Sequence, residues 1–286
     1  MIRSFCKNTY KILLECKKKF HNCSCNHIIF GEDCKQVQCE SKKYLRIGRK
    51  NKNGKRKIMT GQIKDQIRYE DDAVLVCRKP AGIPVQTARA GQQDMVSLLK
   101  NYRAAKKEEP YIGLVHRLDQ PVEGIMVFAK TKQAAAALAA QVGARSVDKN
   151  YYAVIWGKMK GKDGELCDHL LKDGRTNCSR AVSENTPGAK RAELSYHTVA
   201  ETEEKSLLFI TLKTGRHHQI RVQLSHAGHP IYGDGKYGAR KESGYLPLAL
   251  CSCRLGFVHP VTKKKMEFEI RPEGKAFFEF FPPEEK

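Results

Sequence analysis

The stretch of sequence that decides the fold runs from residue 112 to residue 129 and reads IGLVHRLDQPVEGIMVFA. Its two ends, residues 112–115 and 125–129, are apolar and rich in β-branched and aromatic side chains, which predicts two short strands. Residues 116–124 between them carry a cation, a carboxylate and a Pro-to-Gly stretch, which is typical of a loop. Because loops held between strands commonly position reacting groups, Asp119 is a candidate catalytic residue. The alternative is a surface turn whose Arg–Asp pair has little energetic weight.

Strands also dominate the sequence on either side of this stretch. Short apolar and β-branched runs predict further strands at residues 74–78, 151–156, 192–200, 207–213, 246–257 and 266–270. Helices are predicted at residues 133–142, from a run of alanines, and at residues 216–227, from one apolar face. Because strands follow strands more often than they alternate with helices, the sequence predicts an α+β fold with a mainly antiparallel sheet.

The charge of the chain points to a polyanionic partner. The sequence has 52 Lys and Arg against 31 Asp and Glu, a formal net charge of +21. Residues 1–58 hold 16 of these cations and 4 of the acids, so part of the excess could belong to a solvated tail. Residues 59–286 still carry 36 cations against 27 acids. A basic folded region of this kind is typical of proteins that bind nucleic acid.

Residues 1–58 differ in composition from the rest of the chain. They are rich in Cys and Lys, show no helical or strand period, and end in the basic run 49–57, so we predict a disordered N-terminal extension. The segment Cys23-Ser24-Cys25, with a nearby His on either side, suggests a zinc site. However, the two Cys are too close together for the usual zinc finger and no matching second pair follows. We therefore favour a structureless segment and expect no metal.

The sequence offers no sign of export or membrane insertion. No apolar run approaches the length that crosses a membrane, and the first segment is polar and interrupted by Lys, unlike a secretory signal. We therefore expect a cytoplasmic protein whose 11 cysteines are reduced thiols.

A second candidate segment, residues 212–221, reads LKTGRHHQIR. A strand is predicted to end there, and a helix to begin with Arg216 in its first turn. A cation at a helix N-terminus opposes the helix dipole, so Arg216 requires an anion, either Asp119 or a nucleic-acid phosphate. The following loop, residues 228–238, has the glycines of a nucleotide cradle but lacks the strand before and the helix after, so no nucleotide cofactor is expected.

Five segments together resemble the successive motifs of one enzyme family. They are RKPAGIPV at residues 78–85, HRLD at 116–119, KNYYAVIWG at 149–157, TGRHHQIR at 214–221 and GHPIYGD at 228–234. In order and spacing they are similar to the motifs of the RluA-type RNA pseudouridine synthases, across residues 67–272. The resemblance implies the pseudouridine synthase catalytic fold, a mainly antiparallel mixed sheet with flanking helices and loops, in residues 59–276. Residues 277–286 would then be a C-terminal tail.

The resemblance also implies a reaction and a substrate. Specific uridines in structured RNA would be isomerised to pseudouridine, with large-subunit ribosomal RNA as the first expectation and transfer RNA as the second. The N-glycosidic bond breaks, the base turns and its C5 bonds to the sugar, so the reaction is redox-neutral and needs no cofactor. The target base must be flipped out of its stack to be reached. A monomer is the default expectation.

Three catalytic residues follow from the resemblance. Asp119 would be the essential carboxylate, which either attacks the sugar, attacks the base or removes a sugar proton. Tyr151 would lie against the uracil ring and help to exclude water. Arg216 would pair with Asp119 and compensate its charge in a partly apolar pocket.

Five further residues are expected to contact the RNA. Arg117 would enter the RNA stack in place of the flipped nucleotide, and Ile220 would form part of the apolar pocket wall. His116, Lys79 and Arg221 complete the set, although Lys79 could instead simply stand at a strand end. We interpret the histidines of these motifs as structural hydrogen-bonding groups or phosphate neighbours rather than general bases.

Two features depart from the family pattern. Val122-Glu123 stands where Thr-Ser is usual, so Glu123 is either a second functional carboxylate or, as we favour, a loop residue paired with a Lys or Arg. Val222-Gln223 stands where a His often follows the Arg, which is a mild change. The alternative function is an RNA-binding protein that has the same fold but has lost catalysis. The presence of all three residues expected to be catalytic, Asp119, Tyr151 and Arg216, argues against it.

Overall fold

The computed structural model describes residues 63–238 and 247–283. These residues belong to one unit, Gly48–Lys286. The predicted disordered extension, its basic run and the zinc hypothesis at residues 23–25 lie outside the described residues. Within the described ranges, no helix has both the length and the apolar character needed to cross a membrane.

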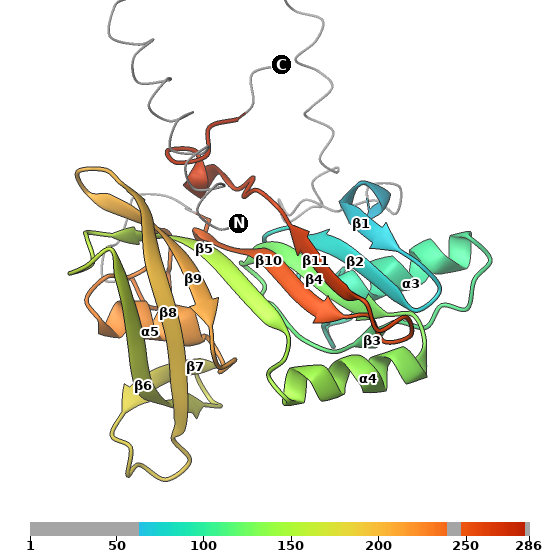
Figure 1. Cartoon of the computed structure of the whole chain (residues 1–286), viewed down its shortest axis with the longest axis horizontal. Helices are drawn as coiled ribbons and strands as arrows, with labels where there is room; N and C mark the ends of the chain where they lie inside the picture. The colour runs from blue at the N-terminus through green and yellow to red at the C-terminus, as the bar shows by residue number, and fades with distance from the viewer. Residues whose placement is uncertain (1–62, 239–246, 284–286) are drawn as a thin grey trace, which may run out of the picture. The chain divides into compact units, whose positions relative to one another are not determined.

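The described strands form one mixed sheet, and the predicted α+β fold is confirmed (Figure 1). The sheet has the order β1-β2-β4-β10-β5-β9-β8-β6-β7, with β3 beside β4 and β11 beside β10. The strands are β1 (Ile67–Glu70), β2 (Val74–Lys79), β3 (Gly113–Leu114), β4 (Glu123–Ala129), β5 (Asp148–Trp156), β6 (Asp163–Asp173), β7 (Cys178–Val182), β8 (Lys190–Glu201), β9 (Lys205–Leu212), β10 (Leu250–Val258) and β11 (Lys265–Glu269). Among these paired strands, β4 and β10 run parallel and the others are antiparallel, as predicted.

Three α-helices flank this sheet in the described part of the chain (Figure 1). The helices α3 (Met95–Ala105) and α4 (Lys132–Gly143) lie along the part formed by β2, β3 and β4, whereas α5 (Gln219–His226) contacts β6 and β7. Single 3₁₀ turns, η1 (Lys64–Gln66) and η2 (Lys275–Phe277), stand near the two ends of the described residues. The start of α3 is fixed by Asp94, whose side chain accepts a hydrogen bond from the Ser97 amide at 2.7 Å.

The sequence did not predict β1, α3, β6 or β7, and it began α5 too early. In β6 only Leu170 is buried, so the strand shows no apolar alternation that would reveal it. The strand is formed instead by pairing with β8 along most of its length. Pairing with a strand that is distant in sequence can make a polar segment a strand, although its own sequence shows no strand pattern.

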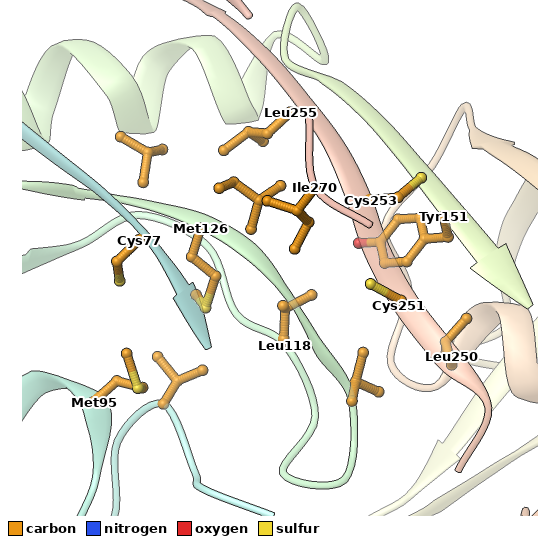
Figure 2. Close-up of a cluster of buried hydrophobic side chains, with 14 of the residues drawn as sticks. Cys77, Met95, Leu118, Met126, Tyr151, Leu250, Cys251, Cys253, Leu255 and Ile270 are labelled. Atoms are coloured by element: carbon orange, nitrogen blue, oxygen red, sulfur yellow. The ribbon is translucent and has the colours of Figure 1, made fainter. Parts of the chain in front are cut away.

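The hydrophobic core lies between the sheet and the helices. Figure 2 shows part of it, from Met95 and Met126 to Tyr151 and Cys251. Phe277 and Phe280 are also buried in this core, and the Phe281 ring lies 5.1 Å from the Tyr152 ring. The packed domain therefore extends past residue 276, into the segment that the sequence assigned to a C-terminal tail.

Gly124 brings the end of the 116–122 loop close to β10. Its φ is +145°, and an added Cβ would lie 2.5 Å from the Ser252 backbone nitrogen. Ser252 is in register with Gly124 on one side and with Tyr151 on the other. The loop that carries Asp119 consequently ends only one strand away from Tyr151.

Candidate active site

The loop carrying Asp119 is held from behind by Lys79. The Lys79 ammonium is fully buried and donates hydrogen bonds to the carbonyls of Pro80 (3.1 Å), Ile83 (2.7 Å) and Gln120 (3.1 Å). Burial lowers the pKa of Lys79 to about 7, although the carboxylates of Asp119 and Glu123 oppose this shift. An enclosed ammonium cannot reach RNA, so the expected RNA contact of Lys79 is not supported. Its position at the end of β2 instead fixes the loop next to Asp119.

Asp119 has two polar neighbours, and both contact the same carboxylate oxygen. Arg221 Nη1 and His218 Nε2 each lie 3.5 Å from Asp119 Oδ2. The Asp119 side chain remains 31% exposed, whereas those of Arg221 and His218 are almost entirely buried. The carboxylate is therefore accessible from the cleft while its partners are fixed inside the protein.

Arg221 is oriented by a second carboxylate. Its Nε and Nη2 donate to the two oxygens of Asp234 at 2.7 and 2.6 Å, a bidentate pair. Burial alone would raise the pKa of Asp234, but the bond to Arg221 outweighs it and keeps this pKa below its usual value. The guanidinium also lies 5.0 Å from the centre of the Tyr237 ring. These contacts leave Nη1 as the group that reaches Asp119.

The expected ion pair between Arg216 and Asp119 is not present among the described residues. Arg216 lines the cleft, but its Nε donates to the Arg191 carbonyl at 2.9 Å. The helix begins only at Gln219, so Arg216 does not lie in its first turn and the dipole argument does not apply. The Gln219 side chain accepts hydrogen bonds from the Thr214 hydroxyl and the Arg216 amide, at 2.8 and 2.9 Å, which organises this start.

Tyr151 and Ile220 line a small recess beside Asp119. Tyr151 belongs to β5 and is 7% exposed, and Figure 2 shows it beside Cys251 and Cys253 of β10. Burial raises the pKa of the Tyr151 phenol, so the ring stays neutral at physiological pH. Ile220 lies on α5 and is 4% exposed. The recess therefore combines an aromatic ring, an aliphatic wall and a carboxylate.

His116 and Arg117 differ in how the cleft can use them. His116 Nε2 accepts the Val127 amide at 3.1 Å, and burial together with the Lys149 charge lowers its pKa to about 3. Its ring is thus neutral and bonded within the protein, which fits the structural interpretation of this histidine and gives no support to its expected RNA contact. Arg117 is exposed and lines the cleft.

The cleft around Asp119 is large and basic. It has a volume of about 1110 Å³. The cations that line it are Arg89, Arg117, Lys149, Lys172, Arg216, Arg221 and Lys236. The described lining contains two carboxylates, Asp119 and Asp234, of which Asp234 is neutralised by Arg221. Such a cleft attracts a polyanion and presents one available carboxylate to it.

Glu123 does not belong to this cleft lining. Its buried carboxylate pairs with Arg78 and accepts the Gly274 amide at 2.9 Å, while Arg78 also pairs with Glu273. The expected pairing of Glu123 with an Arg is thus supported, although Glu123 is the first residue of β4 and not part of the loop, and a second acid or base at the site is not supported. Its bonds connect the end of the loop to the C-terminal segment.

Three residues of the site were missed as such by the sequence analysis, namely His218, Asp234 and Tyr237. Tyr237 Oη lies 2.7 Å from His218 Nδ1 and accepts the Ser179 amide at 2.8 Å. A signal was available, because His218 lies in the motif 214–221 and Asp234 ends the motif 228–234, but neither residue was given a role at the site. In the described part of the chain, no group of three His, Cys, Asp or Glu residues is placed to hold a metal ion.

Comparisons with known proteins point in one direction. A family described as RNA pseudouridylate synthase matches residues 73–226. A ribosomal large subunit pseudouridine synthase C of Buchnera aphidicola is 32% identical over 238 residues, covering 81% of this chain and 72% of that protein. A ribosomal large subunit pseudouridine synthase D of Zymomonas mobilis is 34% identical over 220 residues, covering 71% of this chain and 68% of that protein.

Solved structures show the same fold. The human protein RNA Pseudouridylate Synthase Domain Containing 4 superposes with a TM-score of 0.64 at 24% identity, covering 75% of this chain and 91% of that chain. Human RNA Pseudouridylate Synthase Domain Containing 1 gives a TM-score of 0.60 at 23% identity, covering 72% and 83%. At these identities the likeness concerns the fold alone.

Proposed function

The chain belongs to the RNA pseudouridylate synthase family, and we propose that Asp119 is its catalytic carboxylate and large-subunit ribosomal RNA its substrate. It is an isomerase that converts uridine in RNA to pseudouridine. The substrate proposal is supported by the relatives that are named as ribosomal large subunit enzymes. Transfer RNA is the second candidate, from the sequence resemblance alone.

The observation that carries the assignment of Asp119 is its setting in the basic cleft. The described lining holds two carboxylates, Asp119 and Asp234. Asp234 is paired with the buried Arg221, so Asp119 is the one available to the substrate. Its two protein neighbours contact Oδ2, so we assign Oδ1 to the substrate. Fixed donors on one oxygen orient the carboxylate before the RNA binds, which is how a positioned group lowers a barrier.

The other side chains of the cleft serve the flipped uridine. We assign Tyr151 and Ile220 to the faces of the uracil, since both line the recess beside Asp119. They would exclude water, which could otherwise hydrolyse the broken glycosidic bond. Arg117, exposed at the cleft, fits the role of filling the gap left in the RNA stack. Arg216 becomes a phosphate contact in this proposal, and Arg221 takes the place beside Asp119.

Location and assembly are part of the same proposal. A ribosomal or transfer RNA substrate supports a cytoplasmic location. We also propose a monomer, because the cleft is formed within one chain. Sedimentation of the purified full chain would show a mass of 32.4 kDa, whereas a dimer would have twice that mass.

The test is a pseudouridine map of total RNA from cells that express either the unaltered chain or Asp119→Asn. Pseudouridine is detected by carbodiimide-dependent stops of reverse transcription. We expect one or a few sites in large-subunit RNA to vanish with Asp119→Asn and to persist with Asp163→Asn, an exposed carboxylate of β6. Identical maps, together with no activity of the purified protein on ribosomal or transfer RNA, would leave the RNA-binding alternative.

A further inference from the structure

A chain of hydrogen-bonding groups leads from the β6–β7 hairpin to Asp119. The Ser179 amide of β7 donates to Tyr237 Oη at 2.8 Å, and Tyr237 Oη lies 2.7 Å from His218 Nδ1. The other ring nitrogen, His218 Nε2, lies 3.5 Å from Asp119 Oδ2. His218 is thus the single side chain between the Tyr237 hydroxyl and the carboxylate.

These contacts favour one tautomer of the His218 ring. The Tyr237 oxygen already accepts the Ser179 amide, so its own hydroxyl proton is available to His218 Nδ1. The nearby Cys178 sulfur is a weaker acceptor than an imidazole nitrogen. With Nδ1 accepting, a neutral His218 carries its proton on Nε2, and this N–H faces Asp119.

The surroundings of His218 keep its ring neutral. Burial is the main cause that lowers its pKa, to about 4, and the charges of Arg221, His217 and Lys236 act in the same direction. The carboxylate of Asp119 opposes them. At neutral pH the ring therefore offers Asp119 a hydrogen bond without adding a positive charge.

The ring is also held in place from the other side. His217 stacks on His218 with a centroid distance of 3.8 Å, and its Nδ1 lies 2.9 Å from the Ser179 hydroxyl. His218 has a φ of 54°, in the left-handed region, although its side chain does not cap α5. A residue other than glycine persists there when surrounding contacts hold it. Here those contacts are Tyr237, His217 and Asp119.

We propose that His218 is a positioning residue for Asp119, held by Tyr237 as the tautomer with its proton on Nε2, so that this N–H orients the Asp119 carboxylate. The inference rests on the proposed role of Asp119. Arg221 would supply the positive charge next to the Asp119 carboxylate, and His218 would fix the orientation of that carboxylate. The distance of 3.5 Å is long for a hydrogen bond, and we expect it to shorten when RNA fills the cleft.

The experiment uses the full chain and two replacements of His218. Gln at this position offers an amide N–H close to the place of Nε2–H, whereas Leu offers none. We expect His218→Leu to lower the single-turnover rate about tenfold, the size of one hydrogen bond, with RNA affinity little changed. His218→Gln should recover most of that rate. The control is His226→Gln, an exposed imidazole at the end of α5, which should leave the rate unchanged.

Nitrogen NMR of the imidazole gives a readout that does not depend on activity. We expect His218, assigned by the signals missing in His218→Gln, to show an unprotonated Nδ1 and a protonated Nε2. Tyr237→Phe should mix the two tautomers and lower the rate. A protonated Nδ1 in the unaltered protein, or equal rates for the Leu and Gln variants, would overturn the inference.

Failure of the underlying proposal would look different. If Asp119→Asn retains activity, the assignment of Asp119 is wrong, whatever the tautomer of His218. If Asp119→Asn is inactive and folded while all His218 variants keep the full rate, only the positioning role is wrong.

Discussion

At the scale of single residues, substitutions in the pair Arg221–Asp234 can distinguish an effect on stability from an effect on the reaction rate. Replacing Arg221 by Met leaves the buried Asp234 without its charge partner, so we expect the free energy of unfolding to fall by about 3–5 kcal/mol. The rate should fall as well, because Asp119 loses its cationic neighbour. Urea denaturation and single-turnover kinetics measure the two effects.

The double variant Arg221→Met, Asp234→Asn provides the control. A neutral amide at position 234 can still accept the amides of Lys236 and Tyr237, so stability should return in part. The rate should not return, since Asp119 still lacks its partner. Recovery of both would mean that Arg221 acts only through folding.

The residues around Asp119 show how much of the candidate site the sequence could predict. Asp119, in the loop before β4, and Tyr151, on β5, line one recess, and the sequence resemblance had assigned both to the reaction. The arginine beside Asp119 was wrong by five positions, since the choice depends on where α5 starts. That start depends on contacts of the Gln219 side chain with Thr214 and Arg216, which helix propensity does not report.

At the scale of elements, Glu123 joins the start of β4 to the C-terminal segment. Replacing Glu123 by Gln keeps an acceptor for the Gly274 amide but removes the charge opposite the buried Arg78. Because Arg78 retains Glu273, we expect the free energy of unfolding to fall by about 1–3 kcal/mol.

The rate at saturating RNA should stay within about twofold of the unaltered chain, because Glu123 does not line the cleft and has at most a minor orienting effect on it. Thermal denaturation measures the stability. Single-turnover kinetics, recorded well below the unfolding transition, measure the rate. A folded Glu123→Gln protein that is inactive would revive the second-carboxylate interpretation.

The elements that the sequence analysis missed were missed for different reasons. In α3 the buried Met95, Leu98 and Leu99 have helical spacing and Asp94 caps the helix, so a local signal was present but was not used. In β6 and β7 the side chains are mostly polar and half-exposed, so pairing rather than burial defines these strands. Of the strands that were predicted, β2 and β4 are buried along their whole length.

At the scale of the whole molecule, two sets of Lys and Arg residues could bind RNA, one lining the cleft and one in the first 58 residues. The described cleft carries the cations that surround Asp119, whereas residues 1–58 hold 16 Lys and Arg against 4 acids. Each cation that neutralises an RNA phosphate releases counterions, which makes affinity depend on salt. Both sets of cations can therefore contribute to the salt dependence of RNA binding, and the single-turnover rate should distinguish them.

We expect the basic run 49–57 to contribute to affinity but not to the chemical step. Its six cations are Arg49, Lys50, Lys52, Lys55, Arg56 and Lys57. Every cation that no longer neutralises a phosphate lowers the slope of log affinity against log salt by about 0.7–0.9, so replacing all six by Gln should lower it by about one to five. The single-turnover rate at saturating RNA should stay the same, because no residue assigned to the reaction lies in that run.

The matched comparison is a chain in which the cleft residues Lys149, Lys172 and Lys236 are replaced by Gln. Both chains should bind RNA more weakly and with a smaller salt slope, but only the cleft variant should also lose rate, since these side chains stand around Asp119. An unchanged slope in the 49–57 variant would mean that this charge stays in solvent when RNA binds. In that case the run 49–57 adds nothing to the electrostatic part of RNA affinity, which other cations, those of the cleft among them, must supply.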